Sequence, residues 1–126
     1  MRKKSTPKLL PTQAEVDTYE MLEPILDKIA AEVRELSKKK PDGALNELKV
    51  KMINRVLTQI KDLLKNDSSV QFLDLLDTDI FPTNSDAILI ISQYSAALSA
   101  FKDKYYGRDK DYTYRWFTEE EPGIKI

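Results

Sequence analysis

The fold is decided by residues 84–105, which read NSDAILIISQYSAALSAFKDKY. Apolar residues recur here at steps of three and four, the spacing that places side chains on one face of an α-helix. This face contains Ala87, Ile91, Tyr94, Leu98, Phe101 and Tyr105. We expect the helix to begin at Asn84 or Ser85. Gly107, which follows two cations, predicts a left-handed cap at its end.

A second helical pattern lies near the N-terminus. Thr12-Gln13-Ala14-Glu15 has the capping-box arrangement of a hydroxyl at the helix start and a carboxylate three residues later. An apolar stripe then runs to about Ser37 and contains Tyr19, Leu22, Leu26, Ile29, Val33 and Leu36. Pro24 interrupts it, so the helix either kinks or splits there. We favour one kinked helix, because the stripe keeps its phase across the proline.

The region between these two patterns predicts two more helices. Asp42 is the expected N-cap of a long helix whose apolar stripe contains Leu45, Leu48, Met52, Ile53, Val56, Leu57, Ile60, Leu63 and Leu64. Its short connection to the first helix predicts that the two lie antiparallel. The Asn-Asp-Ser-Ser sequence of residues 66–69 then predicts a shorter helix from Val70 to about Leu76.

Together these patterns predict an all-α fold. We expect a small helical bundle of two long antiparallel helices, one short helix and one long C-terminal helix, followed by a non-helical aromatic C-terminal extension. A flexible basic arm covers residues 1–11, the helical bundle domain residues 12–106, and the extension, extended or strand-like, residues 107–126. No run approaches the roughly 18 apolar residues that span a bilayer, so we expect no membrane partner and a cytoplasmic location.

The composition limits the available chemistry. The 126 residues include no Cys and no His, which excludes thiolate nucleophiles, disulfides, imidazole bases and zinc sites built from these ligands. The net charge is only −1, yet residues 1–65 carry fourteen Lys or Arg and ten Asp or Glu, whereas residues 66–126 carry six and eleven. This asymmetry favours head-to-tail self-association and falls short of the basic surplus of a dedicated nucleic-acid binder.

The C-terminal extension carries the candidate binding residues. Six of the eleven aromatic residues fall within residues 105–117, with three cations among them. The candidate partner surface consists of Tyr106, Arg108, Tyr112, Tyr114, Arg115, Trp116 and Phe117. If this segment is a strand, its two-residue period places Tyr112, Tyr114 and Trp116 against the helices. The other side then offers Arg115 and Phe117 to a partner.

Three interpretations of this segment remain open. It either folds back to seal the helices, binds a protein through residues typical of interface hot spots, or stacks on single-stranded nucleic acid. Our leading hypothesis is a small non-enzymatic protein–protein interaction or regulatory module that acts through this segment or by self-association, with no cofactor and no metal. The alternative is a nucleic-acid-binding protein that uses the basic N-terminal arm and the aromatic, basic tail.

A third hypothesis is a magnesium-dependent hydrolase that uses helix carboxylates. Glu20, Glu23 and Asp27 share one helical face, and carboxylates are the ligands that magnesium prefers. A magnesium site of this kind needs a second pair of carboxylates on the next helix. That helix offers only Glu47-Leu48-Lys49-Val50, so half of the metal ligands would be missing. We interpret this acidic set, and the aspartates within residues 74–86, as solvated charge and helix caps.

Overall fold

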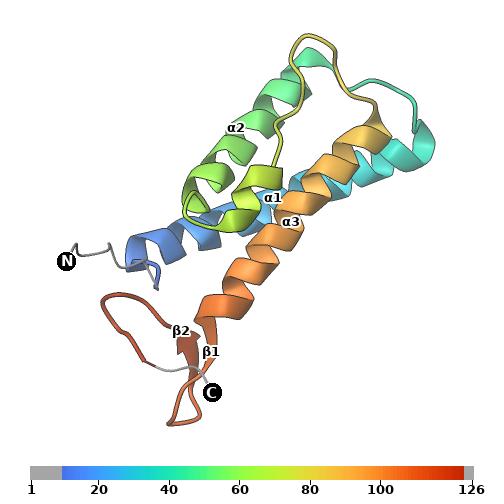
Figure 1. Ribbon diagram of the computed structural model, residues 1–126. Coiled ribbons are helices and arrows are strands. Elements are labelled where there is room, and N and C mark those ends of the chain that lie inside the picture. The colour runs from blue at the N-terminus through green and yellow to red at the C-terminus, as the bar shows by residue number, and fades with distance from the viewer. Residues whose placement is uncertain (1–9, 124–126) are drawn as a thin grey trace, which may run out of the picture.

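The computed structural model describes residues 10–123, and Figure 1 shows them as helices followed by a β-hairpin. The elements are α1 (Gln13–Lys39), α2 (Glu47–Leu63), the 3-10 helix η1 (Ser68–Phe72), α3 (Asn84–Tyr105), β1 (Tyr106–Arg108) and β2 (Tyr114–Trp116). The predicted, mostly helical class is confirmed, and the antiparallel pair of β1 and β2 adds a small sheet to it. No helix within the described residues is both long and apolar enough to cross a membrane.

Helix α1 is the centre of the fold, because both α2 and α3 pack against it (Figure 1). The predicted capping box is present: the Thr12 hydroxyl accepts from the Glu15 N–H at 3.1 Å, and the Glu15 carboxylate accepts from the Thr12 N–H at 2.9 Å. Pro24 lies inside one continuous helix, so the interpretation as a single helix is confirmed. The predicted stripe faces inward, with Leu22 and Leu26 buried.

The start of α2 differs from the prediction. Its N-cap is Asn46, whose side chain accepts a hydrogen bond from the first helical turn, and not Asp42. The preceding loop is instead attached to the start of α3, where the Asn84 side chain donates to the carbonyl of Lys40 at 2.9 Å. Leu45 is buried in the core rather than placed on the helix. The loop turns at Pro41 and Asp42, and the long-range bond and the burial of Leu45 hold the residues that follow outside the helix, so α2 begins only after Asn46.

The connection from η1 to α3, residues 73–83 and here called the return segment, is mostly extended. The predicted short helix is present only as η1, which is capped by Asp67 of the predicted cap sequence, and the prediction that it continues to about Leu76 is wrong. The segment runs between α2 and α3 back to the start of α3 (Figure 1). The Asn54 side chain of α2 donates to and accepts from the backbone of Leu76, at 2.9 and 2.8 Å. The Tyr94 hydroxyl of α3 donates to the Asp74 carbonyl at 2.7 Å. Both helices thus satisfy backbone groups that a helix would have satisfied internally.

One apolar core joins the three α-helices and the return segment. Among the described residues, the most deeply buried apolar side chains are those of Val50, Leu57, Ile60, Ala87, Ile91 and Tyr94. Leu73 and Leu76 add the inward side of the return segment to the same core. Burial raises the pKa of Tyr94 to about 12. Its hydroxyl therefore stays protonated at neutral pH and serves as a structural hydrogen-bond donor.

The end of α3 also differs from the prediction. Gly107 was expected to adopt a left-handed conformation, but none of the glycines among the described residues has a positive φ. The C-cap is Tyr106, with φ −120° and ψ 132°, an extended conformation. Gly107 is buried in β1 opposite Arg115 of β2. The chain passes from helix directly into strand, because β2 supplies the partner for the residues that follow α3.

Candidate protein-binding site

The turn between β1 and β2 is built around Asp109. Its carboxylate accepts from the N–H groups of Asp111 and Thr113, at 2.9 and 3.0 Å. The turn holds Tyr112 at a φ of 61°, a left-handed conformation that costs such a residue roughly 1–2 kcal/mol. The bond from the Thr113 N–H, followed by the bond from Arg115, lowers the pKa of Asp109. The carboxylate is therefore ionised at neutral pH and anchors the turn.

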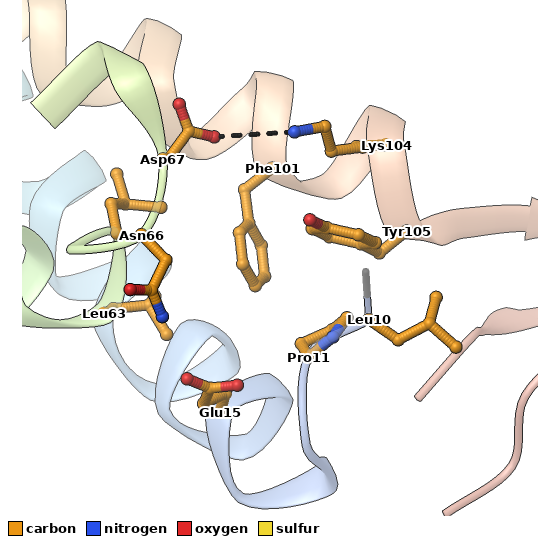
Figure 2. Close-up of a pocket in the computed structure, with 10 residues that line it drawn as sticks. Leu10, Pro11, Glu15, Leu63, Asn66, Asp67, Phe101, Lys104 and Tyr105 are labelled. Atoms are coloured by element: carbon orange, nitrogen blue, oxygen red, sulfur yellow. Dashed lines mark ion pairs between the residues drawn. The ribbon is translucent and has the colours of Figure 1, made fainter. Parts of the chain in front are cut away.

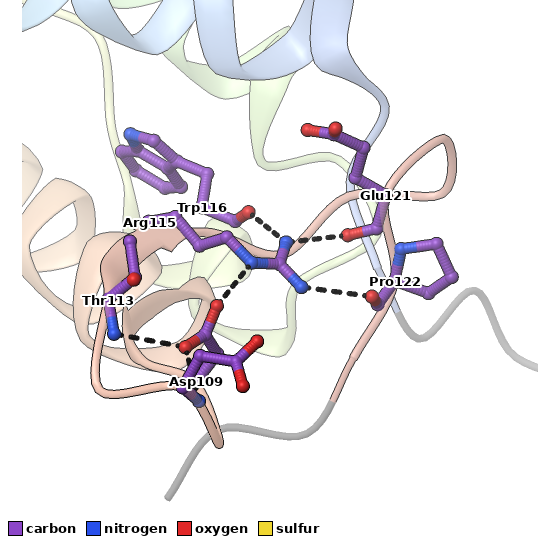
Figure 3. A network of polar contacts seen from close by, with 7 residues as sticks. Asp109, Thr113, Arg115, Trp116, Glu121 and Pro122 are labelled. Carbon is purple, nitrogen blue, oxygen red and sulfur yellow. Dashed lines mark hydrogen bonds and ion pairs between the residues drawn. The ribbon is translucent and has the colours of Figure 1, made fainter.

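Arg115 connects the hairpin to the residues that follow it (Figure 3). Its guanidinium donates to the Asp109 carboxylate at 3.1 Å and to the carbonyls of Trp116, Glu121 and Pro122 at 3.0, 2.8 and 3.1 Å. It also lies 4.5 Å from the ring centroid of Phe117. These bonds occupy four of the five N–H groups of the side chain. Arg115 therefore ties the hairpin to the segment that follows it.

Trp116 attaches the hairpin to the helices. Its ring centroid lies 5.2 Å from that of Tyr19 on α1 and 6.0 Å from that of Phe101 on α3. Tyr19 and Phe101 themselves stack at 5.7 Å. The Trp116 indole N–H donates to the Glu20 carboxylate at 3.3 Å. One aromatic cluster thus joins α1, α3 and β2.

The residues after β2 close over the start of α1. Phe117 is buried, and the Glu119 N–H donates to the carbonyl of Pro11 at 2.8 Å. The Glu120 carboxylate accepts from the Gln13 N–H in the first turn of α1 at 2.9 Å. An anion at this position satisfies a free helical N–H and interacts favourably with the helix dipole. This part of the extension acts as a seal on the helices.

The end of the hairpin farther from α3 presents aromatic residues to solvent. Tyr112 and Tyr114 are 72% and 65% exposed. The Arg108 guanidinium lies 5.0 Å from the Tyr112 ring centroid, and the Lys102 ammonium lies 4.8 Å from that of Tyr106. The rings of Tyr106 and Tyr114 are 6.4 Å apart. We call the group formed by Tyr106, Arg108, Tyr112 and Tyr114 the hairpin face.

The orientation of the extension is partly the reverse of that expected. Trp116 faces the helices as predicted, but Tyr112 and Tyr114 face solvent, whereas Phe117 is buried and Arg115 is bonded inside the molecule. Two features account for this orientation. Backbone carbonyls of the extension hold the Arg115 side chain within it, and Tyr114 lies farther from the end of α3 than Trp116 does. Of the predicted binding residues, four form the hairpin face, and Arg115, Trp116 and Phe117 support it.

Two pockets border this region. The first has a volume of about 90 Å³ and lies between the start of α1 and the end of α3, where Figure 2 shows the ion pair of Asp67 and Lys104 at 3.8 Å. It is far smaller than the roughly 300–1,000 Å³ of typical ligand sites. The second, of about 460 Å³, lies beside Trp116 and is lined by carboxylates that include Glu20 and Glu23.

These carboxylates belong to the set considered for magnesium. The hydrogen bond with Asp27 raises the pKa of Glu23. Burial, followed by the charges of Glu23 and Asp27, raises the pKa of Tyr19. Within residues 10–123, no group of three acidic side chains is arranged to hold a metal ion. The second pocket is accordingly an acidic cleft next to the aromatic cluster.

Sequence reasoning missed two residues of this site, Asp109 and Lys102. An aspartate that accepts from N–H groups two residues later is a common turn signal, so Asp109-Lys110-Asp111 contained the information needed to place the turn. Lys102 was interpreted only as a cation near the helix end, and its position over Tyr106 required the extended conformation that follows α3. The partners of Arg115 are mostly backbone carbonyls, which carry no signal in residue type.

Known proteins offer no guide to this surface. Comparisons with protein-family models, curated proteins and solved structures found no match to the chain. The functional argument therefore rests on the geometry and chemistry of its own residues.

Proposed function

We propose that this protein is a small non-enzymatic interaction module that binds a protein partner through the hairpin face. The observation that carries the proposal is the exposure of Tyr112 and Tyr114 on a hairpin whose turn is held by the hydrogen bonds of Asp109. Tyr and Arg are enriched among interface hot spots, because they combine a large contact area with hydrogen-bonding groups. Tyr106 and Arg108 complete such a surface.

The hairpin face is ordered before any partner arrives. Asp109 fixes the turn, Arg115 fixes the strand behind it, and Arg108 already rests on the Tyr112 ring. A surface that is rigid in the free protein loses less conformational entropy when it binds. Tyrosine adds large contact area with few rotatable bonds, so its ordering costs little. These features support a role in recognition.

Charge favours a protein partner over nucleic acid. Residues 102–121 carry five Lys or Arg and six Asp or Glu, whereas phosphate binding depends on a local surplus of cations. In addition, the Arg108 guanidinium covers the ring of Tyr112, which leaves less aromatic surface for a stacked base. Protein interfaces need no net positive charge, and their cores are depleted in charged residues.

The experiment compares affinity capture from the source cells by the wild-type chain and by a Tyr112→Ser/Tyr114→Ser variant, followed by binding measurements with the purified captured protein. We expect the variant to bind at least tenfold more weakly, since one hot spot contributes about 2 kcal/mol and 1.4 kcal/mol corresponds to a factor of ten. The matched control is Leu89→Ser, because Leu89 is 61% exposed on α3, away from the hairpin face.

The outcomes separate the hypotheses. A captured protein that binds the wild type and the double variant with equal affinity contradicts the proposal. A salt-sensitive complex with a single-stranded oligonucleotide that is lost in the double variant establishes the nucleic-acid alternative instead. Loss of binding in Leu89→Ser to the same extent indicates a different surface.

A further inference from the structure

A second exposed apolar surface lies in a groove of about 510 Å³ between α1 and α2. Its walls are formed by Ile25 and Ile29 of α1 and by Leu48, Met52 and Val56 of α2. Leu48 and Met52 are 66% and 52% exposed, although they belong to the predicted apolar stripe of this helix. The stripe of α2 is therefore wider than the core it covers, and its outer part is left uncovered.

Cations dominate the charge around this groove. Lys28, Lys49 and Arg55 line it together with one carboxylate, Glu32. Lys49 is paired with Glu32 at 3.4 Å, and the described part of the chain contains no ion pair for Lys28 or Arg55. The groove thus combines aliphatic walls with two cations that have no ion-pair partner among the described residues. This combination suits an occupant with apolar and acidic side chains.

The chain itself carries a segment of that chemistry. Residues 72–80, here called the acidic edge, expose Phe72, Leu75 and Ile80, and the aspartates among them are Asp74, Asp77 and Asp79. No Lys or Arg occurs anywhere in residues 66–101. The edge therefore presents apolar residues and negative charge together, and the segment itself contains no cation. The cation that contacts its backbone is Lys61 of α2, at the Leu73 carbonyl.

The acidic edge is also attached to the rest of the molecule at several points. The buried side chains of Leu73 and Leu76 anchor it from within, and the Lys61 ammonium donates to the Leu73 carbonyl at 2.8 Å. The Asp77 carboxylate accepts from the N–H groups of Asp79 and Ile80, at 2.7 and 3.0 Å. The outward side chains thus project from a fixed backbone, which lowers the entropy cost of docking.

The edge cannot enter the groove of its own chain. It is attached to α2 through Asn54, and the groove is lined by Met52 of the same helix. Two positions along a helix correspond to a rotation of about 200°, so these side chains leave α2 on opposite sides. The two surfaces therefore meet only when a second copy of the chain is present.

We infer that this protein self-associates head to tail, with the acidic edge of one copy docked in the α1–α2 groove of the next. Ile80 and Phe72 of one copy pack between the apolar walls of the groove of the next, and the aspartates of the edge pair with Lys28 and Arg55 of that groove. Because the two surfaces differ, the contact is heterologous and generates a ring or an open chain of copies. This inference is independent of the hairpin face, which takes no part in the contact.

The experiment is sedimentation velocity of the full chain over a wide concentration range, at low and high salt. We expect reversible association that weakens with salt, because the contact includes exposed charges. A groove variant, Lys28→Glu/Arg55→Glu, and an edge variant, Asp74→Lys/Asp79→Lys, should each associate at least tenfold more weakly. An equimolar mixture of the two should associate again, since it contains one unaltered edge and one unaltered groove.

Further variants test the apolar part and the independence of the hairpin. Met52→Ser and Ile80→Ser should each weaken association, whereas Leu89→Ser and Tyr112→Ser/Tyr114→Ser should leave it unchanged. Thermal unfolding of every variant checks that it is folded. We expect each to fold, because the altered side chains are exposed. A wild-type chain that stays monomeric at all concentrations overturns the inference. So does association that survives both charge reversals, fails to return on mixing, or is lost in the hairpin variant.

Discussion

Trp116 and Tyr114 lie two residues apart on one strand, yet one is packed against the helices and the other is exposed. Trp116 is opposite Tyr106, the first residue after α3, whereas Tyr114 is opposite Arg108, two residues farther from the helix. The end of α3 thus determines which aromatic residue meets the core. Residue type does not distinguish an aromatic seal from an aromatic surface, but the position relative to the helix end does.

The largest expected effect concerns the inner aromatic cluster. Phe101 is 6% exposed and contacts Tyr19, Tyr105 and Trp116. We expect Phe101→Ala to lower the free energy of unfolding by about 3–5 kcal/mol, because it leaves a cavity between α1, α3 and β2. Urea unfolding followed by circular dichroism measures this loss. A loss below about 1 kcal/mol would mean that this cluster is not central to the fold.

The next effect concerns the hydrogen bonds that Arg115 makes within the extension. We expect Arg115→Ala to cost about 2 kcal/mol, because hydrogen bonds from a charged donor are lost and their acceptors are left without it. The Trp116 emission should shift to the red as the hairpin loosens. Arg115→Lys should recover only part of the loss, since an ammonium cannot reproduce the planar fork.

Arg108 provides the matched control for that prediction. It lies on the same hairpin, but its recorded contact among the described residues is with the exposed ring of Tyr112. We expect Arg108→Ala to change stability by no more than about 0.5 kcal/mol, as is usual for surface substitutions. An equal loss in the two variants would show that positive charge, rather than the bonds of Arg115, stabilises the hairpin.

The parts of the fold that were predicted correctly are those fixed by local sequence. The capping box joins Thr12 and Glu15, three residues apart, and the stripes of α1 and α3 repeat within single helices. The errors arose where distant bonds decide the backbone. Asn84 and Lys40 are 44 residues apart, and Asn54 and Leu76 are 22 apart. A pattern read along the chain carries no information about such pairs.

The candidate site shows the same division. Composition located the aromatic segment, because clustered Tyr, Trp and Arg are visible in the sequence. Its orientation depends on Arg115 reaching backbone carbonyls and on Glu120 reaching Gln13, 107 residues away. The groove between α1 and α2 was hidden for a related reason. Leu48 and Met52 fit the core stripe, and only the packing of the helices shows that they remain exposed.

A smaller effect is expected from pH. The folded-state pKa of Asp109 is lowered, so the stability that it contributes is fully present above the ordinary aspartate pKa of about 3.9. This contribution is lost as pH falls below that value and through the lowered pKa. We expect the Trp116 emission of the wild type to shift to the red in this range. The emission of Asp109→Asn should already be partly red-shifted at neutral pH, and this part of the shift should not change with pH.

The pH test has its own control, because other carboxylates titrate in the same range. Asp77 also has a lowered pKa, caused by the N–H groups of Ile80 and Asp79, but it lies on the acidic edge. Asp77→Asn should leave the pH dependence of the Trp116 emission unchanged. If the Trp116 emission of Asp109→Asn changes with pH in the same way as that of the wild type when pH falls from 7 through the lowered pKa of Asp109, then Asp109 does not anchor the hairpin.

The last effect is small and has the opposite sign. Tyr112 has a φ of 61°, which asparagine adopts more readily than a bulky residue. We expect Tyr112→Asn to raise the free energy of unfolding by on the order of 0.5–1 kcal/mol, part of the cost of the left-handed conformation. Tyr114→Asn, in the strand, should instead lower it, since asparagine is disfavoured there. Chemical unfolding of both variants measures the difference.

This last comparison bears directly on function. The strained backbone at Tyr112 costs stability in the free protein. Such a cost is expected where a side chain is retained for binding. Tyr112→Asn should therefore gain stability and at the same time bind the captured partner more weakly. A variant that is more stable and binds equally well would remove Tyr112 from the hairpin face. A variant that is less stable would show that the Tyr112 ring supports the turn through its contact with Arg108.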